Sequence, residues 1–148
     1  MQQVIVQKFG GTSVGSGERI AAVAEIIKNE AEINTVVVVV SAMAGETDRL
    51  IELSKLFGDN PNKREFDALI STGEKVSASL LAMALNSLGL KAKSYSAAQV
   101  SLKTTSNFSK AKILDIDKTK MEEILADGSI PIITGFQGIT ETGEVTTL

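Results

Sequence analysis

Five consecutive valines, Val36 to Val40, constrain the fold of this 148-residue chain more than any other feature. An unbroken run of β-branched residues is typical of a strand that is covered on both faces, as in a parallel sheet. Residues 3–8 contain a second apolar run, and we expect them to form another buried strand. Between the two, residues 18–31 carry apolar side chains at helical spacing, and Ser16 is a suitable N-cap. This order predicts a βαβ unit with parallel strands.

Two more helices are expected downstream. The first spans residues 47–57 and directs three leucines inward, namely Leu50, Leu53 and Leu56. The second is the longest in the chain, spans residues 65–87, and ends at Gly89. Its predicted apolar stripe consists of Phe66, Leu69, Val76, Leu80, Met83 and Leu88.

The remaining segments continue the α/β alternation. Strands are expected at residues 91–95 and 130–134, with a helix capped by Asp117 between them. The polar cluster at 104–109 indicates either a hairpin or a mobile loop, and residues 135–138 are expected to form a turn. The fold class is therefore α/β, a three-layer sandwich with a mainly parallel, doubly wound sheet, and residues 1–148 are expected to belong to one domain.

Composition limits the chemistry. The chain has neither cysteine nor histidine, which excludes thiol and Ser-His catalysis, disulfides and cysteine-based zinc sites. The net charge of −3 gives no indication of a nucleic-acid partner. The N-terminus lacks the pattern of a signal peptide, and the valine run is too short to span a bilayer. We therefore expect a cytoplasmic protein without a membrane partner.

The segment Lys8 to Gly15 reads Lys-Phe-Gly-Gly-Thr-Ser-Val-Gly and lies between the first strand and the first helix. Adjacent glycines permit positive φ and close approach of a ligand to the backbone, and a helix N-terminus attracts anions. The lysine supplies a cation, although a solvated lysine beside an ordinary turn is an equally simple interpretation. The spacing matches neither a Walker A loop nor a dinucleotide fingerprint. The segment therefore predicts a phosphate site of another kind.

Loops at the carboxyl ends of parallel strands line a common crevice, and three such loops carry polar residues: 8–15, 41–48 and 135–138. Ser41 and Thr47 belong to the second loop, where they either hold a small polar substrate or merely end a strand and cap a helix. Gly73 interrupts the long helix at a cost of about 1 kcal/mol relative to alanine. Glu74 beside it either contacts a ligand, such as a substrate ammonium, or is solvated next to a close helix–sheet contact.

Taken together, five motifs resemble aspartate kinases of the amino acid kinase family, in the same order along the whole chain. They are Lys-Phe-Gly-Gly-Thr-Ser-Val, Val-Ser-Ala-Met-Ala-Gly-Glu-Thr-Asp, Ser-Thr-Gly-Glu-Lys, Gly-Phe-Gln-Gly and Thr-Thr-Leu. The resemblance implies transfer of the ATP γ-phosphoryl group to the β-carboxylate of L-aspartate, the first step towards lysine, threonine and methionine. It also implies a homo-oligomeric protein.

By the same resemblance, the catalytic residue Lys8 and its neighbours Phe9, Gly10, Gly11, Thr12 and Ser13 bind the ATP phosphates. Ser41, Thr47 and Glu74 bind aspartate. Magnesium is expected to arrive with ATP, without a metal site of its own and without any tightly bound cofactor.

The chain departs from the family in two places. A glycine and a histidine that are frequent in the family are missing from residues 99–101 and 107–109. The family also continues beyond the Thr-Thr-Leu motif with an arginine for the substrate carboxylate and a catalytic aspartate, so Leu148 is expected to end a fragment that is inactive alone. The alternatives are a kinase of another small acid or carbamate and a non-catalytic nucleotide-binding module.

Overall fold

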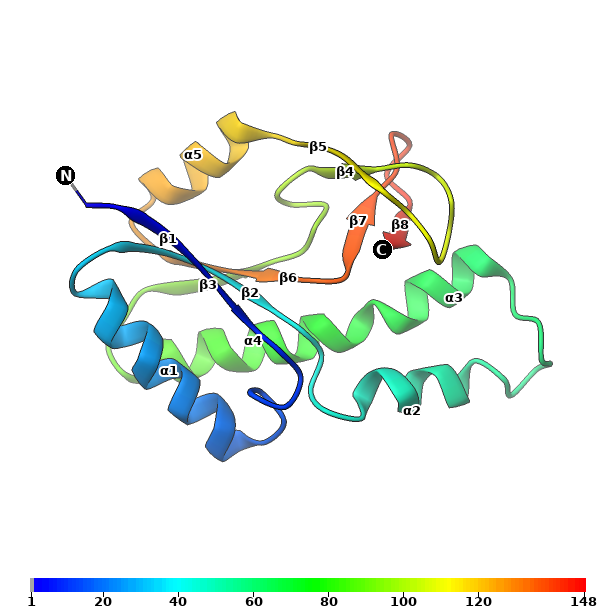
Figure 1. Cartoon of the computed structure of the whole chain (residues 1–148), viewed down its shortest axis with the longest axis horizontal. Helices are drawn as coiled ribbons and strands as arrows, with labels where there is room; N and C mark the ends of the chain where they lie inside the picture. The colour runs from blue at the N-terminus through cyan, green and yellow to red at the C-terminus, as the bar shows by residue number, and fades with distance from the viewer. Residues whose placement is uncertain (1) are drawn as a thin grey trace.

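The computed structural model describes residues 2–148 and has two four-stranded sheets (Figure 1). The first sheet is parallel, with strand order β1-β2-β6-β3, and the second is mixed, with order β5-β4-β7-β8. The elements in chain order are β1 (Val4–Phe9), α1 (Gly17–Ala31), β2 (Thr35–Val40), α2 (Glu46–Leu53), α3 (Lys63–Ile70), α4 (Thr72–Ser87), β3 (Ala92–Tyr95), β4 (Leu102–Thr104), β5 (Ile113–Ile116), α5 (Lys118–Ala126), β6 (Ile130–Thr134), β7 (Gln137–Ile139) and β8 (Val145–Thr147).

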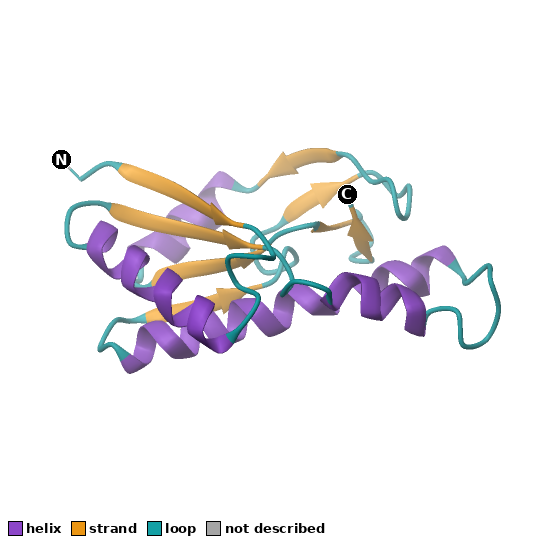
Figure 2. Cartoon of the chain, turned by 60° about the horizontal axis from the view of Figure 1, so that its bottom comes forward, coloured by secondary structure: helices purple, strands orange, loops and turns teal. Residues whose placement is uncertain are grey.

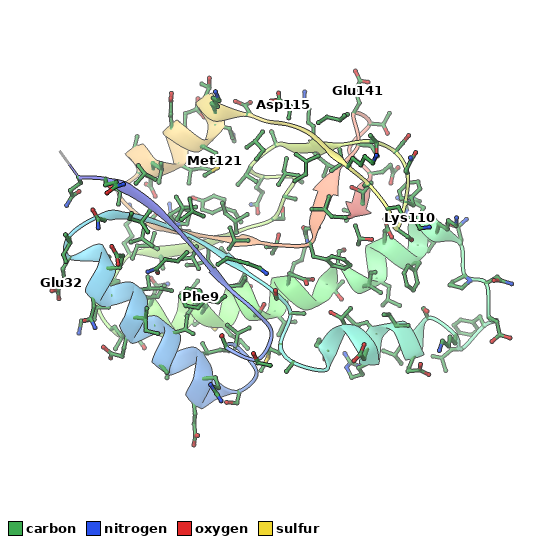
Figure 3. All side chains as sticks on the ribbon, in the orientation of Figure 1. Phe9, Glu32, Lys110, Asp115, Met121 and Glu141 are labelled. Atoms are coloured by element: carbon green, nitrogen blue, oxygen red, sulfur yellow. The ribbon has the colours of Figure 1, made fainter. Side chains whose placement is uncertain are left out.

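The first sheet is the middle layer of the sandwich. Helices α1 and α4 cover one face and α5 lies on the other, as Figures 1 and 2 show. Alternate residues of β2 supply both cores: Val38 packs with α1 and α4, whereas Val37 packs with α5. Met121 points from α5 toward this second core (Figure 3). The valine run is therefore covered on both faces, and the predicted parallel βαβ unit is confirmed.

The first strand forms but is not buried, which corrects the prediction for residues 3–8. Val4 and Val6 are 52% and 64% exposed. The reason is strand order, because β1 lies at the edge of the sheet and pairs with β2 alone among the described strands.

The helix expected over residues 47–57 is shorter and buries less. It ends at Leu53, and only Leu50 of the three leucines is buried, while Leu53 and Leu56 are 38% and 68% exposed. The Ser54 hydroxyl donates to the Ile51 carbonyl at 2.7 Å, and the chain then turns toward α3. Side-chain bonds of this kind compete with helix continuation.

The long helix is divided at Ser71 into α3 and α4. The hydroxyls of Ser71 and Thr72 donate to the carbonyls three residues earlier, at 3.1 and 2.7 Å. The predicted apolar stripe is also wrong, because Val76, Leu80 and Met83 are at least 38% exposed. The described α4 residues that are buried are Gly73, Glu74, Ser77, Ala78, Leu81, Ala82 and Leu85.

Residues 63–87 taken together are long and apolar enough to cross a membrane by length and composition. Half of their most apolar stretch is buried inside the structure. Core helices of globular proteins can have the same length and composition, so these two properties are weak evidence for a membrane span. At its end, Gly89 adopts φ +82° and terminates α4 as predicted.

The remaining predictions largely hold. The strands at 91–95 and 130–134 correspond to β3 and β6, and Asp117 caps α5 by accepting from the Lys120 N–H. The polar cluster at 104–109 belongs to a hairpin, since β4 and β5 pair antiparallel on either side of it. The turn expected over 135–138 is confined to residues 135 and 136, because β7 begins at Gln137.

Candidate active site

A cavity of about 300 Å³, here called the first pocket, is lined by residues that follow β1, β2 and β6. The three loops predicted to share a crevice therefore meet. The lining residues are Gly11 from the first loop, Ser41, Ala42, Met43, Ala44, Gly45, Thr47 and Asp48 from the second, Phe136 from the third, and Glu74 from α4.

Glu74 is the only lining side chain of this pocket that is both ionisable and buried, at 2% exposure. Its Oε1 accepts a hydrogen bond from the Ala42 N–H at 3.1 Å, while its Oε2 is buried without a partner in residues 2–148. Burial raises the pKa of Glu74, and the backbone N–H groups of Glu74 and Ala42 counteract part of this effect. A buried carboxylate with one unpartnered oxygen is suited to a cationic donor.

Hydroxyl groups and a helix end complete the pocket. The side chains of Ser41 and Thr47 make no hydrogen bond within the described residues, so both are available to a ligand. Thr47 does not cap α2, because Gly45 occupies the N-cap position at φ +80°. Gly45, Thr47 and Asp48 of the N-terminal turn of α2 line the pocket, so the partial positive charge of the helix end lies there beside the Asp48 carboxylate. These groups suit the anionic part of a ligand whose cationic part binds Glu74.

The first and second loops are in direct contact at Gly11. The Ala44 N–H donates to the Gly11 carbonyl at 3.1 Å, and a Cβ on Gly11 would lie 2.9 Å from the Ala42 carbonyl oxygen. Neither Gly10 nor Gly11 has a positive φ, so the structure does not use the conformational freedom that these glycines permit. Glycine is required at position 11 for close approach to the neighbouring loop.

This contact predicts different effects for two adjacent glycines. Gly11→Ala is expected to lower the free energy of unfolding by about 1–3 kcal/mol, because the added Cβ meets a backbone oxygen and the backbone must shift to admit it. Gly10→Ala is the matched control, since nothing lies within 4 Å of its added Cβ. It should leave stability unchanged or raise it by up to about 1 kcal/mol. Urea unfolding of the two variants measures the difference, and equal destabilisation would contradict the packing role of Gly11.

The other predicted phosphate-binding residues do not line this pocket. Lys8 is exposed, pairs in register with Val39, and makes no ion pair with any residue of 2–148. Phe9, labelled in Figure 3, packs against the core that α1 and α4 share. Thr12 and Ser13 lie in the turn before α1, where the Ser13 N–H donates to the Gly10 carbonyl at 3.0 Å.

Three buried polar residues that the sequence analysis did not propose for the site, Asp67, Ser71 and Ser77, support Glu74. Asp67, Ser71, Glu74 and Ser77 are at most 3% exposed and follow one another at intervals of four, three and three residues. This is helical spacing, which places the four residues on one face, but the spacing alone does not show that this face is buried. Ser77 donates to the Ser41 carbonyl at 2.6 Å, so this polar row fastens α4 to the second loop.

Asp67 anchors the second sheet to α3. Its carboxylate accepts four hydrogen bonds, from the backbone N–H and the hydroxyl of both Ser109 and Thr147, at 2.8–3.0 Å. Gln137 adds a contact one helical turn later by donating from Nε2 to the Ser71 carbonyl at 3.0 Å. The polar row thus holds β7, β8 and the hairpin between β4 and β5 against the α3–α4 segment.

Phe136 reaches the pocket in an unusual conformation, with φ +67°. A bulky residue rarely adopts this value, so the surrounding structure must impose it. The Phe136 carbonyl accepts from the Leu148 N–H at 3.0 Å, and the next residue, Gln137, is fixed by its bond to Ser71. The aromatic ring is therefore held at the pocket wall by contacts that belong to the second sheet.

The fold and the first pocket define an α/β protein with a polar pocket at the carboxyl ends of its parallel strands, where ligands bind in folds of this kind. The chain belongs to the amino acid kinase family, because the model of that family matches residues 3–148.

Known relatives agree with this assignment. The chain is 52% identical to an aspartokinase of Geobacillus stearothermophilus and 51% identical to an aspartate kinase of Pseudomonas putida, each over 146 residues. These alignments cover 98% of this chain but 36% of each relative. The chain therefore spans about a third of the length of the curated relatives that it matches.

Solved structures show the same fold. The crystal structure of an aspartate kinase from Synechocystis superposes with a TM-score of 0.83 at 43% identity, over 98% of this chain and 23% of that one. Aspartokinase III of E. coli in complex with aspartate and ADP gives a TM-score of 0.80 at 22% identity, over 99% of this chain and 43% of that one. At this lower identity the likeness is one of fold alone.

Proposed function

We propose that this chain is the N-terminal part of an aspartate kinase, which transfers the γ-phosphoryl group of ATP to the β-carboxylate of L-aspartate. The observation that carries the proposal is the unpartnered Oε2 of Glu74 in the first pocket, because the substrate ammonium is the donor that it lacks. The names of the relatives support the same activity. In this account residues 1–148 form part of one amino acid kinase domain.

Roles within the site follow from charge and position. Glu74 binds the ammonium of aspartate, and Ser41 and Thr47 bind its polar groups. Lys8 neutralises phosphate charge as the catalytic residue of this chain, and the segment from Phe9 to Ser13 holds the ATP phosphates through its backbone. Phosphoryl transfer of this kind depends on positioning and charge neutralisation and needs no protein nucleophile.

Magnesium is assigned to the nucleotide and not to the chain. Residues 2–148 contain no group of three or more His, Cys, Asp or Glu side chains suited to hold a metal ion. We therefore propose that magnesium enters bound to ATP phosphates, as is usual for kinases.

The biological setting is proposed from the same activity. We infer a cytoplasmic, homo-oligomeric enzyme of the route to lysine, diaminopimelate, threonine and methionine, without a nucleic-acid or membrane partner. The relatives in bacteria and the net charge of −3 support this inference.

Two alternatives differ in what they predict. A kinase of another small acid or carbamate has no need of a buried carboxylate for an ammonium, whereas Glu74 is buried and half-partnered here. A non-catalytic nucleotide-binding module would bind ATP without turning it over.

A coupled ADP-release assay separates these possibilities. We expect no turnover from the 148-residue chain alone. It matches about a third of the length of its relatives, and we expect the contacts that position both substrates to need the remaining portion as well. Addition of the remaining portion, in one polypeptide or as a second one, should give ADP release that depends on L-aspartate. ATP binding without release would favour the non-catalytic module, and release with another acid in place of aspartate would favour the other kinase. If the 148-residue chain alone releases ADP and Lys8→Met abolishes that release, the expectation that the chain holds only part of the active site is contradicted.

A further inference from the structure

A second cavity, of about 330 Å³, lies beside the first pocket and shares no lining residue with it. It is enclosed by α4 and by the ends of β3 and β6, and Figure 2 shows the strand ends of the parallel sheet lying over this helix. Its polar lining consists of Lys75, Ser79, Ser94, Ser96, Gln99 and Thr134. None of the residues proposed to bind aspartate or ATP belongs to it.

The charge of the second cavity is positive. Lys75 is its one charged lining residue and makes no ion pair within residues 2–148. The nearby lysines behave differently, since Lys91 and Lys93 both pair with Asp127, at 3.1 and 2.7 Å. A free cation among hydroxyl groups, without a carboxylate in the lining, favours an anionic ligand.

One buried hydroxyl of this cavity lacks a hydrogen-bond partner, and one exposed amide has free donors. Thr134 is 3% exposed, and its hydroxyl has no hydrogen-bond partner in the described part of the chain. Buried hydroxyls are nearly always paired, so this one indicates a missing acceptor or donor. Gln99 accepts from the Ser96 N–H through Oε1 at 2.8 Å, which leaves its Nε2 donors free.

We propose that the second cavity binds a small oxyanion, either a carboxylate or a phosphate group. Lys75 supplies the charge, and the hydroxyl of Thr134 and the amide of Gln99 supply hydrogen bonds. The second cavity and the first pocket are adjacent along the chain. Lys75 directly follows Glu74, and Thr134 lies two residues before Phe136. An oxyanion bound here contacts two of the segments that line the first pocket, namely α4 and the end of β6.

An amide-resolved NMR titration of the 148-residue chain tests the proposal without reference to catalysis. Inorganic phosphate and acetate are added separately, with chloride as the ionic-strength control. We expect saturable shifts at Lys75, Ser94 and Thr134 with at least one of the two oxyanions, and none with chloride. Phosphate that binds at Gly10 and Gly11 instead shifts those amides, so the failure of one site is distinguishable from that of the other.

Variants assign the binding to the named groups. Lys75→Gln should weaken the affinity about tenfold, the loss typical of one charge-assisted hydrogen bond. Thr134→Val keeps the side-chain shape and should weaken it severalfold. Lys118→Gln is the matched control, because Lys118 is exposed on α5 beyond the opposite face of the sheet. Absence of saturable shifts with both oxyanions, or unchanged affinity in Lys75→Gln with a native spectrum, would overturn the proposal.

Discussion

Replacement of Lys8 by methionine in a polypeptide that extends beyond Leu148, as the relatives do, is expected to lower kcat by about 10²–10³-fold, the usual cost of one lost electrostatic contact to a transition state. The lysine lies near the end of β1, separated only by Phe9 from the glycine-rich turn that begins at Gly10, and no residue of 2–148 forms an ion pair with it. Methionine preserves length and removes only the cation. The apparent affinity for aspartate should change far less than kcat, because the lysine acts on phosphate charge.

Steady-state kinetics with both substrates varied measures this effect. Lys103→Met is the matched control, since Lys103 is an exposed strand lysine in β4 without an ion pair in the described residues. It should retain wild-type kcat. An unchanged kcat in Lys8→Met would remove Lys8 from the phosphate site.

Glu74→Gln is expected to raise KM for aspartate by about 10- to 100-fold, the range that corresponds to loss of an ion-paired hydrogen bond. Glutamine still accepts from the Ala42 N–H, so the loop geometry is preserved while the charge disappears. KM for ATP should stay nearly constant, which is the mark of lost binding of one substrate. Glu25→Gln, on the exposed face of α1, is the control.

The raised pKa of Glu74 predicts that aspartate binding depends on pH. Burial raises the pKa of Glu74, and only the ionised carboxylate attracts an ammonium. Aspartate binding should therefore strengthen as the pH rises through this raised pKa and weaken as it falls. The Glu74→Gln variant should lack this dependence. Equal KM values for aspartate in wild type and variant across the pH range would make Glu74 a structural residue only.

Local sequence patterns predicted the helices and strands better than they predicted which of their residues are buried. The valine run of β2 and the periodic helix α1 follow from side-chain spacing, which is a local property. The exposure of β1 depends on strand order, because β2 pairs with β1 on one side and β6 on the other. No short-range signal reports which strand lies at a sheet edge.

For the long helix, the sequence did not show which face is buried. Its large apolar residues suggested one buried face, yet α1 and the sheet contact the face that carries Ala78, Leu81 and Leu85. Small and polar residues are favoured there because α4 packs closely. A Cβ on Gly73 would lie 2.8 Å from the Ala42 Cβ. Helical spacing alone was therefore insufficient to choose between two competing faces.

The site was predictable where motifs follow strands. Parallel strands end at one edge of the sheet, so the loops after β1, β2 and β6 had to meet. Burial of Glu74 was not predictable, since it depends on the docking of α4 against the second loop. The same holds for the four-fold hydrogen bonding of Asp67, which joins segments 42 and 80 residues apart.

The central claim is that Glu74 receives the ammonium of L-aspartate, and a calorimetric comparison of L-aspartate with succinate tests it most directly. Succinate has both carboxylates of aspartate and lacks the ammonium. The extended wild-type protein should bind aspartate about tenfold or more tightly than succinate, and Glu74→Gln should abolish most of this preference. If the wild-type protein binds succinate as tightly as aspartate, or if the preference persists in Glu74→Gln, the proposed site is contradicted.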